Sequence, residues 1–144
     1  MGYKSDMDAP VYRYFDHGAD IGVAGYGETL ERAFEAAAYA MFSIMADLDA
    51  VKPASPVDFD FEEADAELAL VTWLNRLLTE AHTRAWVFAR FDLRHKNARW
   101  IGHAWGEPWR DSLERGVEVK GATFTELSVA HSALGWEARC VVDV

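Results

Sequence analysis

Two stretches of the chain repeat apolar residues with the period of an α-helix. The first stretch follows Thr29, a residue type that caps helices, and ends near Asp47. The second follows Asp65, another capping residue type, and its buried stripe covers residues 68–78. In the first stretch the residues off the apolar face are Glu31, Arg32 and Glu35. We therefore expect two amphipathic helices.

The remaining apolar residues are arranged as in β-strands. Residues 57–61 alternate Val, Asp, Phe, Asp, Phe, which is the pattern of a half-buried strand with its carboxylates facing water. Aromatic and β-branched runs predict further strands at residues 11–15, 21–26, 87–93, 100–105, 117–129 and 136–142. Gly106-Glu107-Pro108 is interpreted as a turn. Trp105 and Trp109 flank it and could be exposed there, which would favour a protein-binding patch. The pattern predicts an α+β fold, a two-layer sandwich of two amphipathic helices packed on a mostly antiparallel or mixed sheet.

The length of 144 residues fits one domain. Residues 1–10 are polar and are expected to be a disordered segment, so the single domain is predicted to cover residues 11–144. The longest apolar stretch, residues 36–46, is far shorter than the roughly 20 residues that span a bilayer. The one cysteine, Cys140, excludes an internal disulfide and is interpreted as a core residue. We expect a soluble cytoplasmic protein.

Charge narrows the possible partners. The chain has 14 basic and 24 acidic residues, a formal net charge of −10 with neutral histidines. Such a chain repels a phosphate backbone, so it is a poor candidate for a nucleic-acid binder acting alone. The charge suits a cation site or a basic protein partner better.

Two clusters of oxygen donors suggest a cation site. Asp16, His17 and Asp20 lie in a turn between two predicted strands, and Asp143 precedes Val144 after the last apolar strand. Carboxylates and the main-chain or terminal oxygens of Val144 suit hard ions such as calcium or magnesium. Taken alone, each cluster also has a simpler explanation. The first aspartates can bond turn amides while His17 packs, and Asp143 can be solvated at a frayed end.

Other candidate chemistry is weaker. Lys120 lies among small and apolar residues, and it either faces solvent at a strand edge or meets a carboxylate cluster, where it could contact phosphate or orient an acid. Residues 25–30 follow a strand and precede a helix, like a dinucleotide fingerprint. However, Leu30 replaces the third glycine and Glu28 would repel a pyrophosphate. These glycines are better explained by a tight connection between strand and helix. The histidines lack zinc-hydrolase spacing, and the serines lack a nucleophile elbow.

In their order and spacing, these segments resemble the archease family. Residues 16–22, Asp-His-Gly-Ala-Asp-Ile-Gly, are similar to the family's His-Thr-Ala-Asp-Ile-Gly signature. The likeness extends over residues 12–144 and includes segments 27–30, 34–45, 70–78, 106–107, 119–123 and 142–144. The chain departs from the family pattern at Gly18, where threonine is usual, at Gly121, where alanine is common, and at Phe124-Thr125, which replaces a frequent Tyr-His pair.

The resemblance implies a function without catalysis. Archeases assist the RNA ligase that joins tRNA exons, promoting its GTP-dependent guanylylation and multiple turnover in tRNA splicing and RNA repair. They do not ligate RNA themselves. The resemblance implies the ligase as protein partner, with tRNA reached only through it, and a divalent cation, most often calcium. The implied metal ligands are Asp20, Asp143 and Val144, with Asp16 and His17 as neighbours and Lys120 as the functional lysine.

Two alternatives remain at this point. One is a metal-dependent phosphoesterase or nuclease that uses Asp16, Asp20 and Asp143, with Lys120 on the phosphate. The other is a chaperone-like protein-binding module with an incidental ion. The sequence leaves open the physiological metal, the docking surface on the ligase, the ligase's nucleotide specificity and the oligomeric state.

Overall fold

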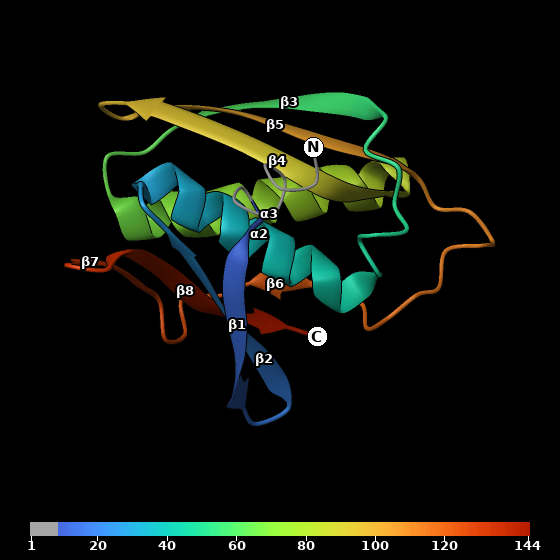
Figure 1. Ribbon diagram of the computed structural model, residues 1–144, viewed down its shortest axis with the longest axis horizontal. Coiled ribbons are helices and arrows are strands. Elements are labelled where there is room, and N and C mark those ends of the chain that lie inside the picture. The colour runs from blue at the N-terminus through green and yellow to red at the C-terminus, as the bar shows by residue number, and fades with distance from the viewer. Residues whose placement is uncertain (1–8) are drawn as a thin grey trace.

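Two antiparallel sheets enclose two helices (Figure 1). The computed structural model describes residues 9–144, and over this range the chain forms two helices and eight strands. The larger sheet has the order β1-β2-β8-β6 with β7 paired to β8, and the smaller sheet has the order β3-β5-β4. In chain order the elements are β1 (Val11–His17), β2 (Asp20–Gly27), α2 (Leu30–Met45), β3 (Ser55–Glu62), α3 (Ala66–Arg84), β4 (Trp86–Lys96), β5 (Arg99–Pro108), β6 (Gly121–Ala122), β7 (Ser128–Ser132) and β8 (Gly135–Asp143). The predicted α+β class is confirmed, and its strands divide between two sheets.

Helix α2 begins where the sequence predicts, because the Thr29 side chain accepts the Arg32 N–H at 3.1 Å. The helix lies between the two sheets, and its alanines are buried on several sides. Strand β2 approaches it closely at Gly25, where a Cβ would lie 2.3 Å from the Ala37 backbone nitrogen. The glycine thus serves close packing of β2 on the body of α2, whereas the sequence pattern assigned it to the connection between strand and helix.

Glu35 lies off the predicted apolar face of α2, yet it is not exposed. Its side chain is only 17% exposed, and its carboxylate accepts the Leu93 N–H at 2.8 Å. Leu93 belongs to β4, an edge strand of the smaller sheet, whose outward N–H groups lack a strand partner. Glu35 is buried because this edge packs against the helix side that the pattern assigns to solvent.

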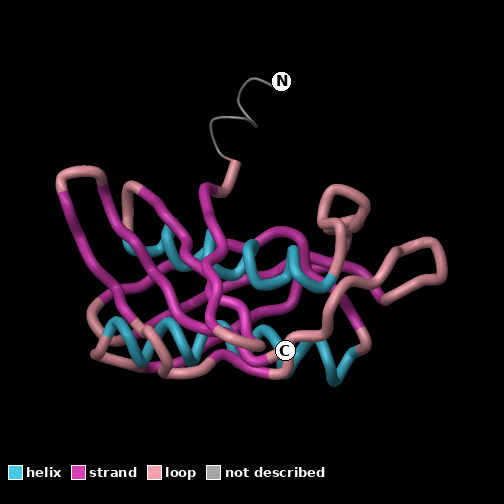
Figure 2. Tube along the Cα trace, turned by 90° about the horizontal axis from the view of Figure 1, so that it is seen from below, coloured by secondary structure: helices cyan, strands magenta, loops and turns pink. Residues whose placement is uncertain are grey.

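Helix α3 also has its predicted cap. Asp65 accepts the N–H groups of Glu67 and Leu68, at 2.8 and 3.1 Å. Its buried stripe includes Trp73, which packs edge-to-face on Phe59 of β3. Both helices run along the length of the molecule, and loops project from its ends (Figure 2).

Two predictions for the later chain are wrong. Residues 117–129 do not form one strand, because Gly116 and Val117 donate their N–H groups to Met45 and Ile44 at the end of α2. Only β6 and β7 are strands in this part, and residues 109–120 form a loop. The expected turn at residues 106–108 is strand, because β5 continues to Pro108 alongside β4.

The buried apolar side chains of the described residues form one core, and Cys140 lies within it, as predicted. Burial raises the pKa of the Cys140 thiol to about 12. No helix within residues 9–144 has both the length and the apolar character to cross a membrane. Most of the segment predicted to be disordered, residues 1–8, lies outside the described residues, and Ala9 and Pro10 are exposed.

Candidate functional site

The first candidate cluster lies at the hairpin that joins β1 to β2. His17 and Asp20 are paired across the hairpin, and Gly18 in the turn has a φ of 61°. Asp16 pairs with Ile21 instead. Because side chains alternate along a strand, Asp16 faces the opposite side of the sheet from His17 and Asp20. The structure therefore places His17, and not Asp16, on the same face as the Asp20 carboxylate.

The start of β2 and the end of β8 lie side by side at Asp20. Strands β2 and β8 pair with Ile21 opposite Val142, and the same register continued by one residue sets Asp20 opposite Asp143. The Val144 N–H donates to Asp20 Oδ1 at 3.4 Å. Residues 124 positions apart in sequence thus lie in contact, and the side chains of Asp20 and Asp143, one from each predicted cluster, face the same side of one sheet.

Lys120 lies next to Asp143, on the β6 side of β8. Gly121 of β6 pairs with Asp143, and the Lys120 N–H donates to the Asp143 carbonyl at 2.7 Å. Lys120 is exposed and directly precedes β6, whereas the sequence predicts it inside a strand. We call the side-by-side residues His17, Asp20, Asp143 and Gly121 the carboxylate row.

Asn75 of α3 holds β6 in position, a role that sequence reasoning missed. Its side-chain amide donates to the Ala122 carbonyl at 3.1 Å and accepts the Ala122 N–H at 2.9 Å. The amide thereby acts as a strand partner for the open side of β6. The signal in the sequence is a polar residue inside the apolar run Leu70 to Leu78. By fixing β6, Asn75 fixes the backbone that carries Lys120.

A buried carboxylate holds the loop that leads to Lys120. Glu107 accepts the Lys52 N–H at 2.6 Å and Arg110 Nε at 2.8 Å. The hydrogen bonds from Arg110, followed by the one from Lys52, lower the pKa of Glu107. This network secures residues 109–120 where they leave β5.

The same loop surrounds a surface hollow of about 270 Å³, lined by Trp109, Arg110, Asp111, Leu113 and Arg115. The Arg115 guanidinium lies 4.0 Å from the centre of the Trp109 ring. Trp109 is half-buried, and so is Trp105, so neither is the fully exposed side chain that a protein-binding patch at this place would use. The carboxylate row contributes nothing to this hollow.

The donor chemistry of the carboxylate row fits a hard divalent cation. Asp20 and Asp143 offer carboxylate oxygens, and Val144, whose N–H donates to Asp20, also carries main-chain oxygen. Within residues 9–144 no group of three or more His, Cys, Asp or Glu side chains could hold a metal ion. A cation in the row would consequently depend on main-chain oxygen and water in addition to two carboxylates.

Comparison with known proteins decides the family. The model of the Archease protein family (MTH1598/TM1083) matches residues 12–144. The chain belongs to the archease family. "Protein archease" of Methanosarcina barkeri is 34% identical over 139 residues, which are 92% of this chain and 95% of the relative. "Protein archease" of Pyrococcus furiosus is 32% identical over 139 residues, which are 92% of this chain and 98% of the relative.

Solved archease-like structures share the fold. The solution structure of protein 1598 from Methanobacterium thermoautotrophicum is 31% identical, with a TM-score of 0.79 over 92% of this chain and 98% of that one. A Thermotoga maritima crystal structure, described as an archease and possible chaperone, is 18% identical, with a TM-score of 0.63 over 92% of this chain and 96% of that one. At that identity the second likeness concerns the fold alone. The resemblance based on sequence motifs is confirmed.

Proposed function

We propose that this archease is a non-catalytic, metal-binding activator of the RNA ligase that joins tRNA exons, and that it acts on ligase guanylylation. The observation that carries the proposal is the contact between the Asp20 carboxylate and Val144, with Asp143 in the next register position. This contact supports the proposal because the implied metal ligands come from two distant segments of the chain. They can share one cation only if these segments lie side by side.

The cation ligands in this proposal are Asp20, Asp143 and the main-chain oxygen of Val144, with His17 beside them. Calcium suits such oxygens because it accepts carboxylate, carbonyl and water ligands in flexible geometry. When bound, the ion offsets the repulsion between the two carboxylates. The chain's own contribution is to hold the ends of β2 and β8 side by side.

Lys120 supplies a positive charge next to this acidic surface. Its backbone is fixed by the bond to Asp143 and, through β6, by Asn75, while its side chain is exposed. An exposed ammonium in that position suits a phosphate group or a carboxylate on the partner. The net charge of −10 favours association with a basic protein such as an RNA-binding ligase. Contact with tRNA then occurs only through the ligase.

Single-turnover guanylylation tests the proposal. Purified ligase is mixed with GTP alone, with the archease, or with its Asp143→Ala or Glu67→Ala variant. Glu67 is the control because it is exposed on α3, outside the carboxylate row. We expect the wild-type chain and Glu67→Ala to accelerate guanylylation, and Asp143→Ala to lose most of the acceleration.

Equal rates with and without the archease would refute the proposal, and so would full acceleration by Asp143→Ala. Hydrolysis of RNA or of phosphoesters by the archease alone would instead support the alternative of a metal-dependent phosphoesterase.

A further inference from the structure

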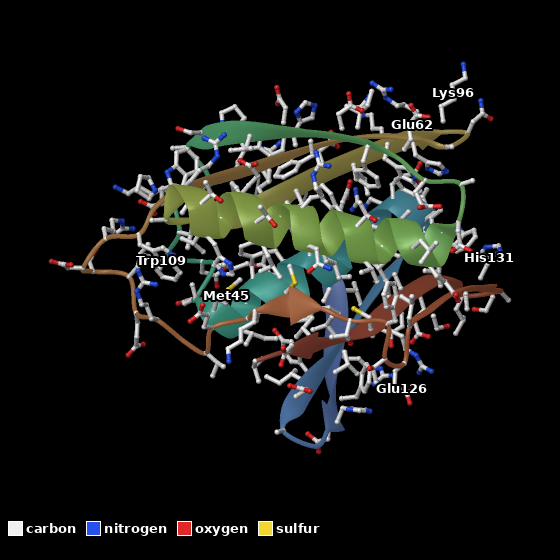
Figure 3. The ribbon with its side chains drawn as sticks, turned by 180° about the vertical axis from the view of Figure 1, so that it is seen from behind. Met45, Glu62, Lys96, Trp109, Glu126 and His131 are labelled. Carbon is white, nitrogen blue, oxygen red and sulfur yellow. The ribbon has the colours of Figure 1, made fainter. Side chains whose placement is uncertain are left out.

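One large apolar side chain near the carboxylate row faces solvent. Phe124 is 66% exposed, whereas every other phenylalanine and tryptophan within residues 9–144 is buried or half-buried. The residue lies on the loop that joins β6 to β7, and Figure 3 shows this loop, marked by Glu126, projecting from the larger sheet. Because single exposed apolar residues are common on protein surfaces, the backbone and the neighbours of Phe124 decide whether it has a use.

The backbone around Phe124 forms a bulge against β8. The Thr123 N–H donates to the Val141 carbonyl at 3.0 Å, and the Val141 N–H donates to the Thr125 carbonyl, also at 3.0 Å. Three residues of the loop therefore oppose one residue of β8, and Phe124 is the middle one. Bulges turn a side chain away from its place in a regular ladder, and they are frequent next to functional sites.

Further hydrogen bonds hold this bulge in place. The Thr123 hydroxyl donates to the Val141 carbonyl at 2.8 Å and accepts the Thr125 N–H at 3.2 Å. The Leu127 N–H closes the following turn by donating to the Phe124 carbonyl at 3.2 Å. The Phe124 backbone is thus fixed although its ring is exposed. A side chain on a fixed backbone loses little conformational freedom when a partner covers it.

The chain that precedes Phe124 has the same character. Val117 is 51% exposed, yet its backbone N–H donates to the Ile44 carbonyl at 3.0 Å. Lys120, which is also exposed on a hydrogen-bonded backbone, lies between these two apolar residues along the chain. We call residues 117–124 the β6 segment. It presents an exposed apolar side chain at each end and a cation between them.

We propose that the β6 segment is the surface by which this archease docks on the ligase, with the Phe124 ring entering an apolar pocket of that partner. The inference rests on the proposed function and adds the place and the chemistry of the contact. Continuity supports it, because β6 pairs with β8 at Asp143 and so joins the segment to the carboxylate row. An aromatic anchor supports it as well, because the centres of protein interfaces are rich in aromatic side chains.

Charge favours a basic partner over a second copy of the chain. Glu118 is exposed two residues before Lys120, and Asp143 is exposed beside it. The whole chain has a formal net charge of −10, so two copies would repel each other at this surface. A ligase pocket with a basic rim would match the carboxylates, and an acidic group within that rim would match Lys120.

Titration of fluorescently labelled archease with the ligase, followed by anisotropy, tests the docking contact apart from activation. The test variant is Phe124→Ala and the matched control is Leu134→Ala, because Leu134 is 98% exposed in the turn between β7 and β8. We expect Phe124→Ala to bind the ligase about tenfold more weakly, or weaker still, as removal of an interface anchor should. The control should bind like the wild type. Urea unfolding of both variants should match the wild type, because both side chains are exposed.

Guanylylation separates this proposal from the proposed function. In Phe124→Ala the archease concentration for half-maximal acceleration should rise by the same factor as the dissociation constant, whereas Asp143→Ala should lose the acceleration at every concentration. Binding that depends on Phe124 but brings no acceleration would support the docking surface and refute the activator function. Equal affinity of Phe124→Ala and the wild type for the ligase would overturn the docking proposal. So would equal losses in Phe124→Ala and Leu134→Ala, or a wild type that does not bind the ligase.

Discussion

At the residue scale, Glu35 gives the structure a defined dependence on pH. Burial raises the pKa of its carboxyl from 4.5 to about 7, and the hydrogen bond from the Leu93 N–H opposes only part of that shift. The folded chain therefore binds this proton more tightly than the unfolded chain does. Folding gains stability from Glu35 as pH falls from about 7 toward 4.5, and the gain is absent above the folded pKa.

The Glu35→Gln substitution tests this linkage, because glutamine can still accept the Leu93 N–H but has no charge. We expect the free energy of unfolding of the wild type to rise relative to the variant by on the order of 2 kcal/mol between about pH 8 and pH 5. Urea denaturation at a series of pH values measures the difference. Parallel curves for the two proteins would contradict the burial argument.

Removal of the Asn75 side chain should loosen β6 while leaving every side chain of the carboxylate row in place. The Asn75→Ala substitution leaves the Ala122 N–H and carbonyl unpaired, which should cost about 1–3 kcal/mol in unfolding free energy. Hydrogen exchange of the Ala122 amide should accelerate more than exchange in β4, which Asn75 does not touch. Uniform acceleration across the chain, or none at Ala122, would show that the amide clamp is unimportant.

At the element scale, the contact of β2 with α2 depends on one glycine. In Gly25→Ala the added Cβ would lie 2.3 and 2.4 Å from backbone atoms of Ala37 and Ala33, so strand and helix must separate. We expect a loss of about 1–3 kcal/mol, measured by thermal or urea unfolding. Gly121→Ala is the matched control. Its added Cβ would lie 3.5 Å from Asn75 Oδ1, which is an ordinary contact, so we expect alanine to be tolerated there. Equal effects of the two substitutions would contradict the packing account.

Local signals predicted the helices and most strands. The caps at Thr29 and Asp65 work through bonds within three residues, and alternation in β3 reflects one buried face. The strand predicted over residues 117–129 was wrong at its start because the loop of residues 109–120 is held by distant partners. These partners are the end of α2 and the Glu107 network. The valines of this segment favour a strand, but they do not show whether a neighbouring strand is present to pair with it. The burial of Glu35 could not be predicted for a related reason, since a second sheet covers the polar side of α2.

At the scale of the whole molecule, the pairing of distant strands brings the predicted site together. The sequence identified Asp20, Asp143, Val144 and Lys120 through family resemblance, and the structure places them around one end of β8. Their contact could not be derived from either cluster alone, because the β2–β8 register is set by the packed core. For the same reason, the hydrophobic pattern could not show that the strands divide between two sheets. Asp16 shows the limit of spacing, since one step along β1 turns it to the other face.

The central claim is that the Asp20 and Asp143 carboxylates jointly hold one cation, and calorimetric titration with Ca²⁺ tests it most directly. The titration compares the wild type with Asp20→Asn, Asp143→Asn and the control Asp111→Asn, an exposed aspartate on the loop after β5. We predict one calcium ion bound by the wild type and the control, and an affinity lower by at least about tenfold, or about 1.4 kcal/mol, in each of the other two. Absence of binding by the wild type, or equal affinity in all four proteins, would contradict the account.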